Sequence, residues 1–169
     1  MDSLELFRPN VAVLLTDGHG RVLLCEREQQ DYEASVQTVQ GGIDEGESVT
    51  DAALRETSEE LGIDPSIIQI LGVMEERFCY RWDPEHIAQW GKEFPIRAAI
   101  EHFVGQEQQF VCAQIEPGTP MNLDAHHREF RCVRWGTPQE LIEGCWDRKR
   151  PGIIAALQYF ELLDVKFVA

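Results

Sequence analysis

Apolar residues alternate with short polar turns at the start of the chain. Asn10–Leu15 and Arg21–Cys25 are rich in residues that favour strands, and the turn-forming residues Asp17–Gly20 separate them. This pattern predicts a β-hairpin. The glycine-rich stretch Gly41–Gly46 follows, and it predicts a loop because glycine weakens regular structure.

Three helices are predicted from capping residues and apolar spacing. Ser48 is a typical N-cap and Gly62 a typical C-cap, so we expect a helix over Val49–Leu61. Thr137–Glu140 is a capping box with proline at the first helical position. The last helix is amphipathic, with apolar residues at helical spacing at Ile153, Ile154, Leu157, Phe160 and Leu163.

Further strands are predicted where β-branched and aromatic residues gather. They cover Ile68–Met74, Phe110–Ile115 and Phe130–Trp135, whereas Arg77–Arg97 shows no regular pattern. Strands interleaved with a few helices are typical of a mixed α/β sandwich. We therefore expect one α/β domain over residues 1–169.

The composition narrows the classes of function. The chain has 169 residues, a formal net charge of −15 and 43% hydrophobic residues, which suits a folded domain. A surface of that charge repels nucleic acid, so DNA and a long RNA footprint are disfavoured as partners. No apolar stretch approaches the roughly 20 residues of a membrane helix. Because the start shows no secretory signal and the five cysteines form no C-x-x-C pair, we expect a cytoplasmic protein without membrane contact.

Three carboxylates stand out on the first predicted helix. Glu56, Glu59 and Glu60 lie at positions i, i+3 and i+4, so they project from one face and repel one another. A hard divalent cation such as Mg²⁺ or Mn²⁺ would offset that repulsion, because both ions prefer oxygen ligands. The alternative is a solvated acidic face without a ligand.

The surrounding spacing favours the metal. The stretch 41–63 reads G-x5-E-x7-R-E-U-x-E-E-x-G-U, where U is usually a bulky aliphatic residue, and chance would produce its seven fixed positions with a probability on the order of 10⁻⁵. The pattern is carried by Gly41, Glu47, Arg55, Glu56, Thr57, Glu59, Glu60, Gly62 and Ile63. It resembles the Nudix box, and Thr57 is its one departure. The resemblance implies a Nudix-type α/β/α sandwich with a mixed β-sheet and a loop-helix-loop catalytic motif.

The resemblance also implies residue roles. The family hydrolyses a nucleoside diphosphate linked to another moiety and uses Mg²⁺, with Mn²⁺ as the alternative. Glu47 and Arg55 match a pair that braces the loop against the helix, and Gly62 belongs to the structural part of the motif. The residues that match metal ligands, or a backbone that approaches the metal, are Glu56, Glu59, Glu60 and Gly41. The base that activates water is left open between Glu56, Glu60 and Glu129.

Short matches outside the box are similar to the bacterial RNA pyrophosphohydrolase and dinucleoside polyphosphate hydrolase branch of the family. These matches are Phe7–Val11, Gln40–Ile43, Gly105–Phe110, and Glu129 and Phe130 with Trp135. By position, substrate phosphates would be contacted by Arg8, Arg27 and Ser35, and Glu129 would be an added metal-binding or catalytic carboxylate. Glu107 and Gln109 stand where the branch usually has basic residues.

The expected function is therefore Mg²⁺-dependent hydrolysis of a phosphoanhydride bond. The expected substrates are dinucleoside polyphosphates such as diadenosine tetraphosphate, or triphosphorylated RNA 5′ ends. The missing basic residues and the acidic surface favour the dinucleotide. Two alternatives stay open, namely another small diphosphate such as a nucleotide sugar or a nucleoside triphosphate, and a non-catalytic Nudix-fold binding module. The oligomeric state is undetermined by these patterns.

Overall fold

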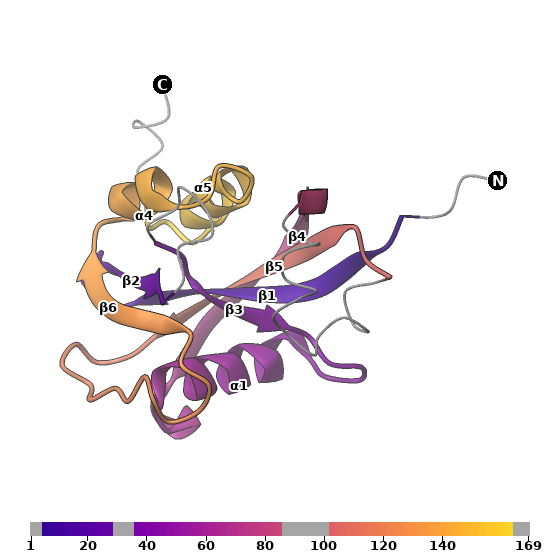
Figure 1. Cartoon of the computed structure of the whole chain (residues 1–169). Helices are drawn as coiled ribbons and strands as arrows, with labels where there is room; N and C mark the ends of the chain where they lie inside the picture. Colours follow the sequence, from indigo (N-terminus) through magenta and orange to yellow (C-terminus); the bar gives the residue numbers. More distant parts are fainter. Residues whose placement is uncertain (1–4, 29–35, 86–101, 164–169) are drawn as a thin grey trace.

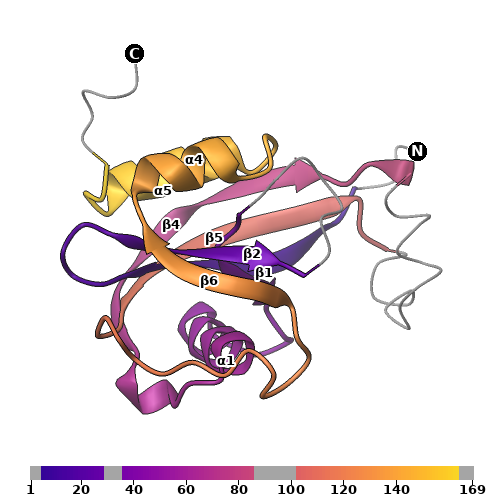
Figure 2. The ribbon, with the colours of Figure 1, turned by 60° about the vertical axis from the view of Figure 1, so that its left-hand side comes forward.

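A mixed sheet forms the centre of the molecule, with helices on both sides (Figures 1 and 2). The computed structural model describes residues 5–28, 36–85 and 102–163. The strands are β1 (Phe7–Thr16), β2 (Val22–Arg27), β3 (Val39–Gly42), β4 (Gln69–Arg81), β5 (Gly105–Gln114) and β6 (Phe130–Gly136). The helices are α1 (Val49–Leu61), α4 (Pro138–Gly144) and α5 (Arg150–Tyr159), with a short 3₁₀ turn, η1 (Pro65–Ile67). Helix α1 lies on one face of the sheet, and α4 and α5 lie on the other (Figure 1).

The sheet branches beside its central strand. Its order is β4-β5-β1-β2-β6, and β3 also pairs with β1. The β1–β5 pair is parallel and the others are antiparallel, so the sheet is mixed. Next to the turn, Thr16 pairs with Val22 of β2, whereas β3 pairs with β1 over Asn10–Val13.

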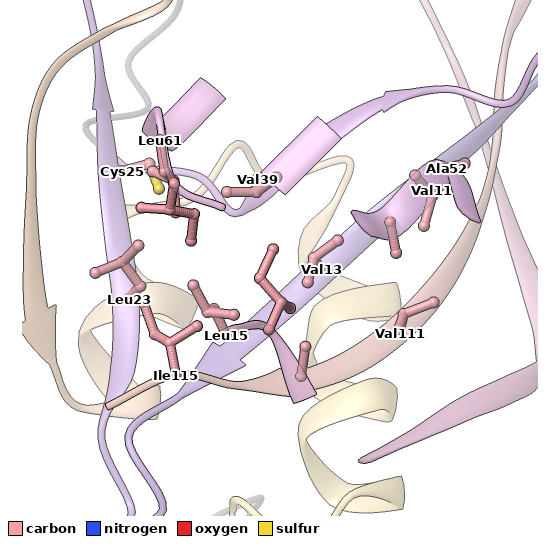
Figure 3. Packing of buried hydrophobic residues seen from close by; sticks show 14 of the residues in the cluster. Val11, Val13, Leu15, Leu23, Cys25, Val39, Ala52, Leu61, Val111 and Ile115 are labelled. Atoms are coloured by element: carbon pink, nitrogen blue, oxygen red, sulfur yellow. The ribbon is translucent and has the colours of Figure 1, made fainter. Parts of the chain in front are cut away.

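Two apolar cores fill the two sides of the sheet. Strand β1 reads as one apolar run because successive side chains enter opposite cores. Val11, Val13 and Leu15 face α1, where they pack in one cluster with Leu61 (Figure 3). Ala12 and Leu14 enter the second cluster, which α4 and α5 cover.

The predicted ends of α1 and the predicted start of α4 are confirmed. The Ser48 hydroxyl accepts a hydrogen bond from the Asp51 N–H at 3.0 Å, and Gly62 ends α1 in the left-handed region with φ 61°. Thr137 and Glu140 form the reciprocal capping box of α4. The hairpin and the strand beginning at Phe130 are also present. Among the described residues, no helix is long and apolar enough to cross a membrane.

Several boundaries differ from the prediction, and β1 and β5 begin earlier than expected, at Phe7 and Gly105. Gly41 and Gly42 belong to strand β3 rather than a loop, because β1 pairs with them despite their low strand propensity. Strand β4 continues to Arg81, where pairing with β5 compensates for an irregular pattern. Residues 86–97 of that irregular region lie outside the described residues. Helix α5 ends at Tyr159, so the apolar residues beyond it pack from outside the helix.

Candidate active site

An ion pair ties the loop after β3 to helix α1. Arg55 Nε and Nη2 donate to the two carboxylate oxygens of Glu47 at 2.8 and 2.9 Å, and Nη2 also donates to the Gly42 carbonyl at 2.9 Å. Glu47 in turn accepts from the Asp44 N–H at 3.0 Å. These hydrogen bonds, led by that from Arg55, lower the pKa of Glu47 to about 2. The contacts hold the loop and the helix in one fixed relation.

Glu56 is held between that arginine and the glycine of β3. Arg55 Nη1 donates to Glu56 Oε1 at 2.7 Å and lies 3.6 Å from Glu59 Oε2. A methyl group added at Gly41 would overlap the Glu56 carboxylate, so only glycine lets the strand approach this closely. Burial raises the pKa of Glu56, and the Arg55 guanidinium partly counters it. The Glu59 side chain is 45% exposed.

Glu60 is the most buried of these carboxylates. It is 7% exposed, and its Oε2 has no hydrogen-bond partner. Burial and the nearby carboxylates of Glu129 and Glu56 raise its pKa well above the usual range, and a hydrogen bond from the Gln40 backbone counters this only in part. Glu129 is half-buried and immediately precedes β6. Glu60 is therefore not part of a solvated acidic face.

This acidic cluster, defined as Glu56, Glu59, Glu60 and Glu129, suits a divalent cation. It offers hard carboxylate oxygens, one of them buried and without a partner, beside a strand that glycine keeps free of a side chain. Neighbouring carboxylates at this burial require nearby positive charge to be ionised together. In the described parts of the chain, no three acidic, His or Cys side chains are already arranged as a metal site. The Arg55 guanidinium instead contacts Glu56 and lies near Glu59.

A lysine that the sequence patterns did not single out lies near Glu129 and Glu60 of this cluster. Lys149 precedes α5, donates from Nζ to Gln40 Oε1 at 2.8 Å, and lies 5.5 Å from the centre of the Tyr80 ring. Burial first, and then the charge of Arg27, lowers its pKa to about 7, while Glu129 and Glu60 act in the opposite direction. The run Arg148–Arg150 is a basic segment in an acidic chain, and this was the available signal.

The three residues predicted to contact phosphate, Arg8, Arg27 and Ser35, differ in their surroundings. Arg27 ends β2 near Lys149, and its Nε is buried without a hydrogen-bond partner. Arg8 lies against Gly42, where a methyl group would overlap its guanidinium. Ser35 lies outside the described residues. The structure therefore gathers Arg27 with the acidic cluster and places Arg8 on the neighbouring strand.

Glu107 and Gln109 of β5, which stand where the branch usually has basic residues, each form a hydrogen bond within the protein. Glu107 accepts a hydrogen bond from Arg77 on β4 at 3.0 Å. Gln109 is buried and donates to the Met74 carbonyl at 3.1 Å. Neither therefore supplies positive charge to a substrate. Phe130 is fully buried in the core cluster on the α1 side of the sheet.

Comparison with known proteins places this site in a family. The model of the NUDIX domain matches residues 6–157. An RNA pyrophosphohydrolase of Roseobacter denitrificans is 30% identical over 156 residues, which is 92% of each chain. An RNA pyrophosphohydrolase of Novosphingobium aromaticivorans is 34% identical over 138 residues, or 80% of each chain.

Solved structures show the same fold at lower identity. The dihydroneopterin triphosphate pyrophosphohydrolase of E. coli has a TM-score of 0.66 at 15% identity, covering 92% of this chain and 99% of that one. An Ap4A hydrolase of C. elegans, in a binary complex, has a TM-score of 0.61 at 13% identity with the same coverage. The loop-helix-loop geometry, the family match over most of the chain and this fold agree, and the chain belongs to the Nudix family of hydrolases.

Proposed function

We propose that this protein is a Mg²⁺-dependent pyrophosphohydrolase that cleaves a phosphoanhydride bond of dinucleoside polyphosphates. The observation that carries the proposal is the acidic cluster, in which the buried Glu60 oxygen has no partner and Gly41 leaves room beside Glu56. Nudix hydrolases use divalent metal, and carboxylate oxygens in this number suit Mg²⁺.

The roles of the residues follow from their positions. Glu56, Glu59, Glu60 and Glu129 would hold the metal, which when bound supplies charge neutralisation and a water of lowered pKa. One of these carboxylates accepts the proton of the attacking water, since hydrolysis requires a base within hydrogen-bond reach. Glu47 and Arg55 keep the loop and helix together. Lys149, together with the nearby Arg27, brings positive charge close to Glu129 and Glu60. A chain of phosphates requires such charge for binding.

The choice of substrate rests on charge. The chain carries a net charge of −15, and Arg77 is already paired with Glu107 on the strand pair β4–β5. A long RNA meets this surface over many phosphates, whereas a dinucleotide presents only those that enter the site. Both its ends are nucleosides, so the acidic surface repels it less.

Triphosphorylated RNA 5′ ends are the second candidate. The observation in their favour is the printed name of the sequence relatives, which are RNA pyrophosphohydrolases. Those relatives are about one-third identical to this chain, and the branch usually carries basic residues at the positions of Glu107 and Gln109. A preference for RNA would mean that Arg8 and Arg27 outweigh the acidic surface.

Product analysis separates these candidates. Diadenosine tetraphosphate and a 5′-triphosphorylated RNA are offered separately with Mg²⁺, alongside the Glu60→Gln variant. Preferential cleavage of the dinucleotide that depends on Glu60 supports the proposal. Preferential release of phosphate or pyrophosphate from RNA selects the second candidate. If neither is cleaved, nucleotide sugars and nucleoside triphosphates are offered next, and a protein inert toward all of them is a binding module.

A further inference from the structure

A chain of hydrogen bonds leads from Lys149 into the middle of the sheet. Lys149 Nζ donates to Gln40 Oε1 at 2.8 Å, and Gln108 Nε2 donates to the same oxygen at 3.1 Å. Gln108 Nε2 also donates to Asn10 Oδ1 at 2.9 Å. We call these four residues the amide chain. Its three amides come from the segments Phe7–Val11, Gln40–Ile43 and Gly105–Phe110, which are far apart in the sequence.

The lysine sets the direction of this chain. An ammonium group can only donate, so the atom of Gln40 that faces it is the carbonyl oxygen. That oxygen then requires a donor from Gln108, whose amide nitrogen has a second hydrogen for Asn10. Each amide has one orientation that satisfies its neighbours, and the lysine selects it.

The far end of the chain is rigid. Asn10 and Gln108 are paired positions of the parallel strands β1 and β5, and they are 1% and 2% exposed. Buried amides in the middle of a sheet cannot change rotamer without leaving hydrogen-bonding groups unsatisfied. Through Gln40 they restrict an ammonium group that would otherwise move on a flexible four-carbon stem. The Lys149 amino group is therefore held in position before a substrate arrives.

Because the amides are neutral, they do not cancel the charge of the Lys149 ammonium group. A carboxylate at position 40 would pair with Lys149 and neutralise its charge, whereas an amide oxygen holds the ammonium and leaves its charge available. In a chain with a net charge of −15, cations near the acidic cluster are few and this difference matters.

We propose that Gln40 is a positioning residue, anchored by Gln108 and Asn10, that holds the Lys149 ammonium where it meets the phosphates of the substrate. This rests on the proposed function, because the phosphates belong to the nucleotide polyphosphate. Gln40 acts through Lys149 and not on the substrate. Its contribution belongs to substrate affinity, since the preplaced charge lowers the ordering required on binding.

A double-mutant cycle tests this proposal. Gln40→Met, Lys149→Met and the double variant are compared for KM and kcat with diadenosine tetraphosphate and Mg²⁺. Gln109→Met is the matched control, because it removes a buried glutamine hydrogen bond from the next position of β5, which faces the opposite side of the sheet. Gln40→Glu tests the role of charge neutrality.

We expect Lys149→Met to raise KM by about tenfold and Gln40→Met by severalfold, the range typical for hydrogen bonds to charged groups. Gln40→Met should add nothing in the Lys149→Met background. Gln40→Glu should raise KM at least as much as Gln40→Met, and Gln109→Met should leave KM unchanged. An unchanged KM in Gln40→Met, or an equal effect with and without Lys149, overturns the proposal.

A binding measurement keeps the two proposals separate. The affinity of each variant for inorganic triphosphate is measured by calorimetry in EDTA, where no turnover occurs, and the same non-additive pattern is expected. If the wild-type protein leaves diadenosine tetraphosphate intact, the proposed function fails for that substrate, while the calorimetric cycle still decides the role of Gln40. Triphosphate affinities equal to wild type in both single variants overturn the role of Gln40.

Discussion

A buried hydroxyl on helix α1 provides a quantitative test of the structure. Thr57 is 0% exposed, and its Oγ1 has no hydrogen-bond partner. A buried hydroxyl without a partner costs about 1–3 kcal/mol relative to water. Valine has nearly the same shape and a similar helix propensity. The Thr57→Val variant should therefore increase the free energy of unfolding by about 1–2 kcal/mol.

Urea unfolding measures this effect. For a chain of this length, 1 kcal/mol corresponds to a change in Tm of about 2–4 °C. The midpoint of unfolding should rise while its dependence on urea concentration stays unchanged, since the exposed surface is the same. Thr57→Ser is the control, because it keeps the hydroxyl and removes a buried methyl group, which should lower stability by about 1 kcal/mol.

A midpoint for Thr57→Val at or below that of the wild type would refute this reasoning. It would mean that the hydroxyl is hydrogen-bonded in the folded protein, for example to a carbonyl of the preceding turn. Thr57 occupies a position where the Nudix box usually has a bulky aliphatic residue. A stabilised variant would show that the buried hydroxyl lowers stability and is not required for folding.

Three further predictions concern the site. Glu60→Gln should lower turnover at least about 100-fold, because it removes a proposed metal ligand. It should not lower the melting temperature in the absence of metal, because it relieves repulsion between buried carboxylates. Wild-type turnover in this variant would refute the assignment. The pKa of Glu47 is about 2 instead of its ordinary 4.5, so its pairing with Arg55 stabilises the fold above pH 4.5 and is lost as the pH falls toward 2. Glu47→Gln should therefore lose about 1–2 kcal/mol at pH 7 after allowance for solvent screening, and the gap from wild type in acid titrations of stability should close by about pH 2; a gap that does not change with pH would contradict the ion pair. Gly41→Ala should lower activity more than about tenfold, because its methyl group displaces the Glu56 carboxylate, and equal activity in steady-state assays would show that the carboxylate can move away freely.

The local parts of the site were predictable from neighbouring residues. Ser48 and Gly62 set the ends of α1 through hydrogen bonds to groups within a few positions, and helical spacing alone places Glu56 and Glu60 on one side. The spacing from Glu47 to Arg55 likewise marked a pair that the structure brings to 2.8 Å. Short-range geometry of this kind depends little on the rest of the chain.

Other features depend on which segments meet. Gly41 and Gly42 look like a loop in the sequence, yet β1 pairs with both, and their missing side chains make room for Glu56 and Arg8 on opposite faces of the sheet. The burial of Glu60 was equally out of reach, since periodicity describes a helix face but not the depth at which the sheet covers it.

The amide chain also depends on contacts between segments that are far apart in the sequence. Local hydrogen bonding and residue spacing are enough to specify helix α1, its caps and the family to which the chain belongs. The meeting of Lys149 with Gln40 joins residues 109 positions apart, and Gln108 contacts Asn10 across 98 positions. Such contacts exist because strand pairing and the packing of α5 bring distant segments together, and no local pattern encodes those distances.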